Sequence, residues 1–216
     1  MTKAIWPDRR QAGRELAEHL LAWDGQGHTT TVVAVPRGGV AVAVEVARRL
    51  RLPITTWSVR KLSLPDNPEL AIGAIGPGEV ELWDDRAERL LAGQPERRRR
   101  VVTAARLELE RRRRLFGDAA PAELRGRQLI VVDDGVATGL TVCAALDSLR
   151  ALGPASLILA VPVVGREVKG WLAGRVDTMV ALAVVRDLQA VGLHYHRFEQ
   201  LDDSTVLSLL AGCRGG

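Results

Sequence analysis

The chain has 216 residues, of which 47% are hydrophobic and 26% charged, so a single globular α/β domain with one sizeable core is expected. No apolar run approaches the ~20 residues of a membrane span, and the start of the chain lacks the apolar core of a secretory signal, which predicts a cytoplasmic protein. The net charge is a modest +4, and Cys143 and Cys213 have neither disulfide nor zinc spacing. Composition therefore argues against membrane-spanning, secreted and cysteine-stabilised classes.

Strand and helix patterns alternate along most of the chain. Asp8 and Gln11 fit a capping box at the start of the first helix. In chain order, strands are predicted over 29–35, 54–59, 129–132, 156–164 and 178–185, and helices over 8–23, 40–50, 95–116, 141–152, 166–172 and 204–211. Residues 63–78 are rich in Pro, Gly and Asn, which predicts a loop and a hairpin-like excursion that returns through a strand over 79–83. We therefore expect an α/β fold, an open, mostly parallel twisted sheet flanked by helices.

Two arginine quartets, 97–100 and 111–114, fall in one predicted helix. Their offset is close to four helical turns, so they lie on roughly overlapping faces. A basic stripe of this kind could bind RNA or another polyanion. No interleaved aromatic residues accompany it, however, and Glu108 and Glu110 each lie four residues before an arginine, at the spacing of helical ion pairs. The sequence therefore favours a solvated helix face over nucleic-acid binding.

The segment 129–141, LIVVDDGVATGLT, is the most informative part of the chain. A buried strand would end at Asp133 and Asp134, at the carboxyl edge where open α/β sheets bind ligands. A purely structural role explains two adjacent carboxylates poorly, because they repel each other and lose solvation. The turn that follows leads into a helix N-terminus, whose free backbone N–H groups and dipole form an anion cradle. The carboxylates can accept hydrogen bonds from hydroxyl groups, and the adjacent cradle can hold an anion. Together they predict a phosphorylated sugar as the ligand.

This segment resembles the phosphoribosyl diphosphate (PRPP) signature of type I phosphoribosyltransferases. The resemblance implies that Asp133 and Asp134 bind the ribose 2′- and 3′-hydroxyls, and that the backbone from 136 to 141, with two threonine hydroxyls, holds the 5′-phosphate. The PRPP-binding residues implied in this segment are Asp133, Asp134, Gly135, Val136, Ala137, Thr138, Gly139, Leu140 and Thr141. A wider set of motifs (PRGG, VRK with NPELAIGA, VDDGVATG, and AVG followed by Tyr195 and Phe198) is similar, over nearly the whole chain, to a bacterial group of predicted phosphoribosyltransferases.

A second loop, Arg37-Gly38-Gly39, is expected at the same edge of the sheet. Taken alone, this loop could be a plain strand-to-helix turn. It could also be an anion site, in which the glycine N–H groups face the anion beside the donor fork of Arg37. The resemblance implies that Arg37, Gly38 and Gly39 bind the pyrophosphate of PRPP, often through a strained or cis peptide. We therefore expect unusual backbone geometry at Pro36–Arg37.

Lys61, one of only three lysines in the chain, precedes the long loop. In the family that loop is mobile and closes over the reacting sugar, where it keeps water from a sugar cation. Two interpretations of Lys61 stay open, a pyrophosphate or transition-state contact and a solvated loop cation.

The tail, residues 186–216, is expected by resemblance to form a small hood over the acceptor, above a core of about 8–185. Whether the N-terminus contributes to the hood is left open. Tyr195 could stack on the acceptor ring beside Val191, or it could be an ordinary packing tyrosine. His194 and His196 have no accompanying set of carboxylates and cysteines, which disfavours a metal site there.

One departure from better-known family members bears on the acceptor. Enzymes that act on hypoxanthine and guanine carry an aspartate two residues before the signature glycine, as a base near the purine. Here that position is Ala137. The resemblance therefore disfavours a 6-oxopurine acceptor without naming another.

The leading hypothesis is a single-domain transferase (1–216) that moves the 5-phosphoribosyl group from PRPP to a nitrogenous base or related nucleophile. The candidate catalytic residues are Asp133 and Asp134, which would orient the ribose and hold Mg²⁺ indirectly through PRPP, and Arg37 and Lys61, which would stabilise the departing pyrophosphate. Its partners would be PRPP and an unidentified small-molecule acceptor, with no membrane, and the resemblance suggests a homodimer. The alternative is a PRPP- or nucleotide-sensing regulator whose arginine-rich helix contacts RNA or a protein.

Overall fold

A five-stranded parallel sheet lies at the centre of the computed structural model, which describes residues 4–64 and 66–214. Its strand order is β2-β1-β6-β7-β8, and every neighbouring pair is parallel. The strands are β1 (Thr30–Ala34), β2 (Ile54–Thr56), β6 (Gln128–Val132), β7 (Ser156–Gly165) and β8 (Thr178–Val185). In register, Ala34 lies opposite both Thr56 and Val132, so the loops that follow β2, β1 and β6 leave from one edge of the sheet.

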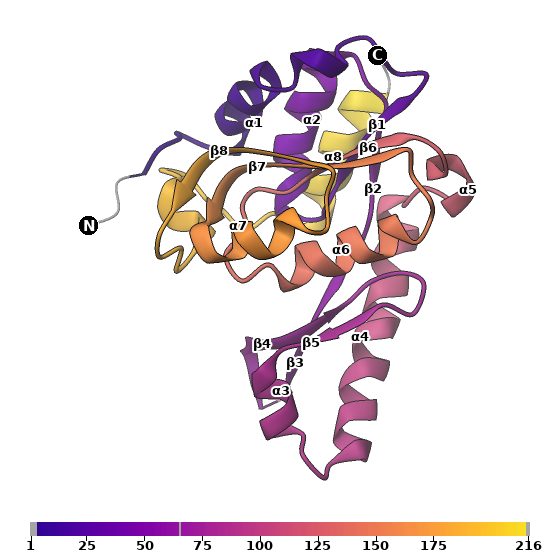
Figure 1. Cartoon of the computed structure of the whole chain (residues 1–216), viewed down its shortest axis with the longest axis vertical. Coiled ribbons are helices and arrows are strands. Elements are labelled where there is room, and N and C mark those ends of the chain that lie inside the picture. Colours follow the sequence, from indigo (N-terminus) through magenta and orange to yellow (C-terminus); the bar gives the residue numbers. More distant parts are fainter. Residues whose placement is uncertain (1–3, 65, 215–216) are drawn as a thin grey trace.

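Helices cover both faces of this sheet, as Figure 1 shows. Side chains alternate along β1 and β6: Val32 and Ile130 pack with one helix layer, whereas Val33 and Val131 pack with the other. The first layer holds α1 (Arg9–Glu18), α2 (Gly38–Leu50) and α8 (Asp203–Arg214); the second holds α6 (Leu140–Arg150) and α7 (Arg166–Ala173). The sheet is therefore buried on both faces, which explains why its strands are near-continuous apolar runs.

Residues 60–116 form an inserted unit, which we call the antiparallel lobe, and Figure 1 shows it projecting from the parallel sheet beyond α6. It contains β3 (Arg60–Leu64), β4 (Asn67–Ile75), β5 (Glu81–Trp83), α3 (Asp85–Leu90) and α4 (Pro95–Phe116). Its strands are antiparallel in the order β3-β4-β5. The lobe has its own apolar cluster, in which Leu62 and Ile72 pack against Val101 and Leu109 of α4. Phe116, at the far end of α4, is buried in the core of the parallel sheet.

The structure confirms the α/β class and the mostly parallel sheet, and it shifts several predicted bounds. Asp8 caps α1 by accepting a hydrogen bond from the Gln11 N–H at 2.9 Å. The helix predicted over 8–23 ends at Glu18, because the next N–H groups bond three residues back, and a short 3-10 turn, η1 (Leu21–Trp23), follows. The expected loop after 63 was wrong in part, since β3 and β4 fill most of it.

The remaining elements are short. They are α5 (Pro121–Leu124), before β6, and η2 (Val191–His194), in the tail. The N-terminal segment joins the tail through a bridge between Trp6 and Tyr195, and the Ile5 N–H donates to the His194 carbonyl at 2.8 Å. Within the described residues, no helix combines the length and hydrophobicity that crossing a membrane requires.

Candidate functional site

A polar cavity of about 660 Å³ opens at the carboxyl edge of β1, β2 and β6. It is lined by residues 35–38, 59–61, 133–139, 141 and 142, together with Arg112, Val191 and Gln200. The cavity thus brings together both aspartates, Arg37, Lys61 and most of the expected phosphate loop. Gly39, Leu140 and Tyr195 are not among its lining residues.

The two aspartates have unequal surroundings. Asp134 Oδ2 accepts a hydrogen bond from Arg9 Nε at 2.7 Å in an ion pair that is largely shielded from solvent. Asp133 Oδ1 accepts the Asp134 N–H at 2.9 Å. Burial raises the pKa of Asp133 well above its ordinary value, and the neighbouring Asp134 adds to that rise. Burial also raises the pKa of Asp134, although Arg9 opposes the rise. Both carboxyls are therefore disfavoured as anions by burial, but Asp134 has an ion-pair partner in Arg9 that offsets part of this cost.

Arg9 is held from three sides. Besides Asp134, it donates from Nη1 to the Glu199 carbonyl at 2.9 Å, and its guanidinium lies 3.6 Å from the centre of the Phe198 ring. These contacts join α1, the loop after β6 and the tail at one point. They are long-range in sequence, so the chain carries no local pattern that marks Arg9 as a site residue.

The loop after β1 approaches Asp134 so closely that only glycine fits. A Cβ at Gly38 would overlap the Asp134 carboxylate, and a Cβ at Gly39 would lie 2.7 Å from the Val132 carbonyl oxygen. The Pro36–Arg37 peptide is cis, which confirms the expected unusual geometry at this bond. Arg37 lies at the cavity wall, with Nη1 3.7 Å from Asp203 Oδ1 at the start of α8. The glycines thus permit the loop to sit directly beside the acidic doublet.

The loop after β6 turns the first residues of α6 toward the cavity. The Val136 N–H donates to the Val163 carbonyl at 2.9 Å, which ties the loop to β7. Gly139 adopts φ +80° as the N-cap of α6, a left-handed conformation that favours glycine. Thr138 and Thr141 line the cavity, and the first turn of α6 offers N–H groups without partners inside the helix. Leu140 is buried in the core behind them. This arrangement is suited to an anion.

Three cations of the antiparallel lobe line the cavity, namely Arg60, Lys61 and Arg112, and we call this lobe side the cationic wall. Lys61 lies in β3, paired with Ala74, so it sits on a strand and is not a loop cation, which was one of its two interpretations. The expectation of a solvated arginine face is wrong for Arg112, whose side chain is only 12% exposed. Its Nε lies 2.8 Å from Glu108 Oε1, the expected i,i+4 pair, whereas Glu110 pairs with Arg113 one residue nearer than predicted.

Tyr195 has a packing position. Its ring lies against Trp6 and Phe198, with ring centres 5.5 and 5.1 Å away, and the residue is buried. Its hydroxyl donates to the Asp134 carbonyl oxygen at 2.6 Å, and burial raises its pKa. These contacts favour the packing interpretation of Tyr195 over the stacking one. Val191, the other residue expected near the acceptor, does line the cavity.

Residues 4–172 match the family model of the phosphoribosyl transferase domain. The chain belongs to the phosphoribosyl transferase family. Two curated relatives from Mycobacterium tuberculosis strains, each named "Putative phosphoribosyl transferase", are 39% identical to it over 209 residues. That match covers 95% of this chain and 46% of each relative, so the chain spans about half the length of the curated relatives it matches.

Solved structures share the fold. A Thermus thermophilus protein, TT1426, is 38% identical with a TM-score of 0.74, and the match covers 97% of this chain and 99% of that one. A hypothetical protein from Neisseria gonorrhoeae, crystallised with bound ppGpp, has a TM-score of 0.52 at 17% identity, with 98% of each chain covered. The second likeness concerns the fold alone.

The sequence alone did not single out Arg60 and Arg112, which line the cavity, or Arg9, which pairs with Asp134. Arg60 belongs to the VRK motif and adjoins Lys61, so its place in the motif was a usable signal. Arg112 belongs to an arginine quartet, and no local sequence pattern distinguishes it from its exposed neighbours Arg111 and Arg114. Its position depends on where α4 ends relative to the parallel sheet.

Proposed function

We propose that this protein transfers the 5-phosphoribosyl group from PRPP to a nitrogenous base or related nucleophile, with release of pyrophosphate. The observation that carries the proposal is one cavity with three chemically distinct parts: carboxylates, the N-terminus of α6, and a cationic wall. PRPP has the matching parts, which are ribose hydroxyls, a 5′-phosphate and a diphosphate. Family membership over residues 4–172 supports the same assignment.

The sugar and its 5′-phosphate would occupy the β6–α6 side of the cavity. Asp133 would accept hydrogen bonds from the ribose hydroxyls, and Asp134 would contribute beside it while Arg9 holds one of its oxygens. The backbone from 136 to 141, with the hydroxyls of Thr138 and Thr141, would bind the 5′-phosphate. An ionised carboxylate near the anomeric carbon would also favour the positive charge that develops there in the transition state.

The leaving group would lie toward Arg37 and Lys61, which line the same cavity. Cations placed there stabilise the negative charge that accumulates on the departing pyrophosphate. Because both groups belong to a strand or a tight loop, they need little reorganisation during the reaction. The acceptor would enter beside Val191, which lines the same cavity.

Mg²⁺ fits this site only as an ion shared with the substrate. Among the residues that the structure describes, no group of three or more His, Cys, Asp or Glu side chains could hold a metal. Mg²⁺ commonly binds one or two carboxylates together with substrate phosphates and retains water, and Asp133 with Asp134 supply that donor type. When bound, the ion would neutralise charge on the diphosphate and ribose oxygens.

The first experiment tests binding apart from turnover. Calorimetry with Mg²⁺ should show PRPP binding to the wild type and a loss of at least tenfold in affinity for Asp133→Asn, which removes the carboxylate charge at nearly constant size. Asp85→Asn, an exposed acid of α3, is the matched control and should leave the affinity unchanged. An Asp133→Asn variant that binds PRPP as tightly as the wild type would overturn the site assignment.

A second experiment tests the reaction. A panel of bases incubated with PRPP and Mg²⁺ is scored for base-dependent pyrophosphate release. Release with one base class would support the transferase. Tight PRPP binding with no pyrophosphate release for any base would instead favour the regulatory alternative. Binding of ppGpp should then also be measured, because a protein of the same fold was crystallised with it.

A further inference from the structure

The antiparallel lobe contributes charge to the cavity as well as structure. In Figure 1, α4 runs back from the far end of the lobe to the parallel sheet. Arg112 lies near the sheet end of α4, and Arg60 begins β3. The base of the lobe is fixed there, because the buried Asp118 carboxylate accepts the Ser58 N–H at 2.7 Å and the Thr56 hydroxyl at 2.8 Å. Arg60 and Arg112 are thus held at the cavity wall by ordered elements.

The cations at the lobe side of the cavity have few carboxylate partners. Glu108 pairs with Arg111 at 2.7 Å and with Arg112 at 2.8 Å. Asp203 pairs with Arg111 at 3.0 Å and lies 3.7 Å from Arg37. Among the described residues, Arg60 forms no ion pair, and Lys61 adds a further cation beside it. Asp133 and Asp134 line the same cavity, but Asp134 is already paired with Arg9. Arg112 shares Glu108 with Arg111, and Arg60 has no carboxylate partner of its own among the described residues.

This crowding of cations points to a multiply charged anion. Burial lowers the pKa of Arg60, and the charge of Arg112 lowers it further, although Glu108 opposes the fall. Crowded cations of one sign are unfavourable in the free protein, and an anion of two or more charges would relieve their repulsion. Arginine is suited to such an anion because its planar donor fork matches phosphate oxygens.

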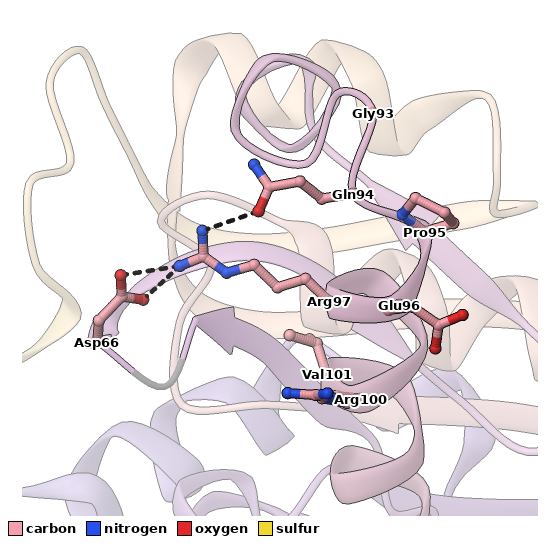
Figure 2. A pocket seen from close by; sticks show the side chains of 8 residues that line it. All are labelled: Asp66, Gly93, Gln94, Pro95, Glu96, Arg97, Arg100 and Val101. Atoms are coloured by element: carbon pink, nitrogen blue, oxygen red, sulfur yellow. Dashed lines mark hydrogen bonds and ion pairs between the residues drawn. The ribbon is translucent and has the colours of Figure 1, made fainter.

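The other end of α4 shows a contrasting arrangement. Figure 2 shows a separate pocket there, in which Asp66 binds the Arg97 guanidinium through both carboxylate oxygens at 2.8 Å, and Gln94 also contacts it. Arg97 is therefore neutralised within the protein. Arg97 thus differs from Arg60, which has no carboxylate partner at the cavity end among the described residues.

We infer that Arg60 and Arg112 bind the diphosphate of PRPP, so that the antiparallel lobe supplies leaving-group contacts beyond Arg37 and Lys61. This inference rests on the proposed function and assigns part of its site. Glu108 is then a positioning residue that holds the Arg112 guanidinium toward the cavity. The 5′-phosphate, at the N-terminus of α6, would not contact this wall.

The test compares three probes by calorimetry with Mg²⁺: PRPP, inorganic pyrophosphate and ribose 5-phosphate. Arg112→Gln and Arg60→Gln should each weaken PRPP and pyrophosphate about tenfold or more, the usual effect of losing a hydrogen bond to a charged group. Both should leave ribose 5-phosphate within about twofold of the wild type, because it lacks the diphosphate. Arg114→Gln, an exposed arginine of the same quartet, is the matched control and should change none of the three.

Two more variants test geometry. Arg112→Lys keeps the charge but loses the fork, so its pyrophosphate affinity should fall between those of the wild type and Arg112→Gln. Glu108→Gln should weaken pyrophosphate in the wild-type background and have no further effect in Arg112→Gln, a coupling that a merely structural role would not produce. Thermal unfolding checks that each variant is folded. If Arg112→Gln is not folded, the affinity of Arg112→Lys for pyrophosphate tests the inference in its place.

The outcomes separate the inference from the proposed function. A wild type that binds neither PRPP nor ribose 5-phosphate overturns the proposed function, and the inference with it. A wild type that binds PRPP while Arg112→Gln and Arg60→Gln retain full pyrophosphate affinity overturns the inference alone. Equal losses for pyrophosphate and ribose 5-phosphate also overturn it, because they would indicate a general disturbance of the cavity.

Discussion

Arg9 Nε lies 2.7 Å from Asp134 Oδ2, although the two residues are 125 positions apart in the chain. The pair joins the first turn of α1 to the loop after β6, and Phe198 stacks on the guanidinium from the tail. Three segments that are remote in sequence therefore meet at one carboxylate. Because Arg9 already pairs with Asp134, it is the ionised form of Asp133 that a bound ligand would have to stabilise.

Removal of Arg9 should destabilise the protein strongly. Arg9→Ala leaves the Asp134 carboxylate shielded from water without its partner, a change that typically costs roughly 3 kcal/mol or more. Urea unfolding measures it. Arg14→Ala is the matched control on the same helix, since Arg14 is 61% exposed and its pair with Glu45 should be worth less than about 1 kcal/mol. Equal free energies of unfolding for the two variants would show that the Arg9–Asp134 pair contributes no more to stability than an exposed pair.

The ligand-free protein should lose stability as pH rises above the ordinary range of an aspartate. The pKa of Asp133 is raised in the folded state, so the folded state keeps a proton that the unfolded state has already released. The free energy of unfolding should therefore fall from about pH 4 upward until folded Asp133 ionises. Asp133→Asn should flatten that slope and raise stability near neutral pH by roughly 1 kcal/mol. Chemical unfolding at several pH values checks this, and an unchanged slope in the variant would contradict it.

Gly38→Ala should disrupt both the fold and the site. The added Cβ would overlap the Asp134 carboxylate, so either the loop after β1 or the Arg9 pair must move. We expect lower thermal stability and a PRPP affinity reduced more than tenfold. Gly170→Ala is the control, because a Cβ there meets nothing within 4 Å, and alanine in α7 should stabilise the helix by about 0.5–1 kcal/mol. A Gly38→Ala protein with wild-type stability and binding would show that the loop accommodates the methyl group.

Tyr195→Phe should affect stability and leave acceptor use unchanged. It removes the hydroxyl that donates to the Asp134 carbonyl at 2.6 Å, a loss worth about 1 kcal/mol, and keeps the ring between Trp6 and Phe198. Once an acceptor is found, the ratio of its KM in the variant to that in the wild type should be close to one. A large rise in that ratio would restore the acceptor role that the packing of Tyr195 argues against.

Local patterns were sufficient to predict most of the fold. The apolar runs of β7 and β8 and the full extent of α4 follow from periodicity, and the Asp8 cap follows from one side chain and its spacing. The antiparallel lobe was recognised only as an excursion. Its strands depend on pairing between β3 and β4, with bulges near Ser63, and such pairing leaves little trace in a single sequence.

The candidate site was predictable where its residues are adjacent in the chain. Asp133, Asp134 and the loop that follows them form one motif, and the cis peptide lies where the resemblance placed it. Arg9 and Arg112 could not be found in that way, because Arg9 reaches Asp134, and Arg112 the cavity, from helices whose placement is a property of tertiary packing. A charged side chain on a helix has the same sequence pattern whether it faces solvent or a pocket.

The separate apolar cluster of the antiparallel lobe has a consequence for how such proteins diversify. Among the described residues of the lobe, those that line the candidate cavity come from the start of β3 and the last turns of α4, whereas Leu64, Leu91 and Val101 pack further along the insertion. Insertions, deletions or exchanges at its outer tip should thus be absorbed without moving the residues of the candidate cavity. The outer half of this excursion is where new recognition surfaces can arise while the proposed site stays intact.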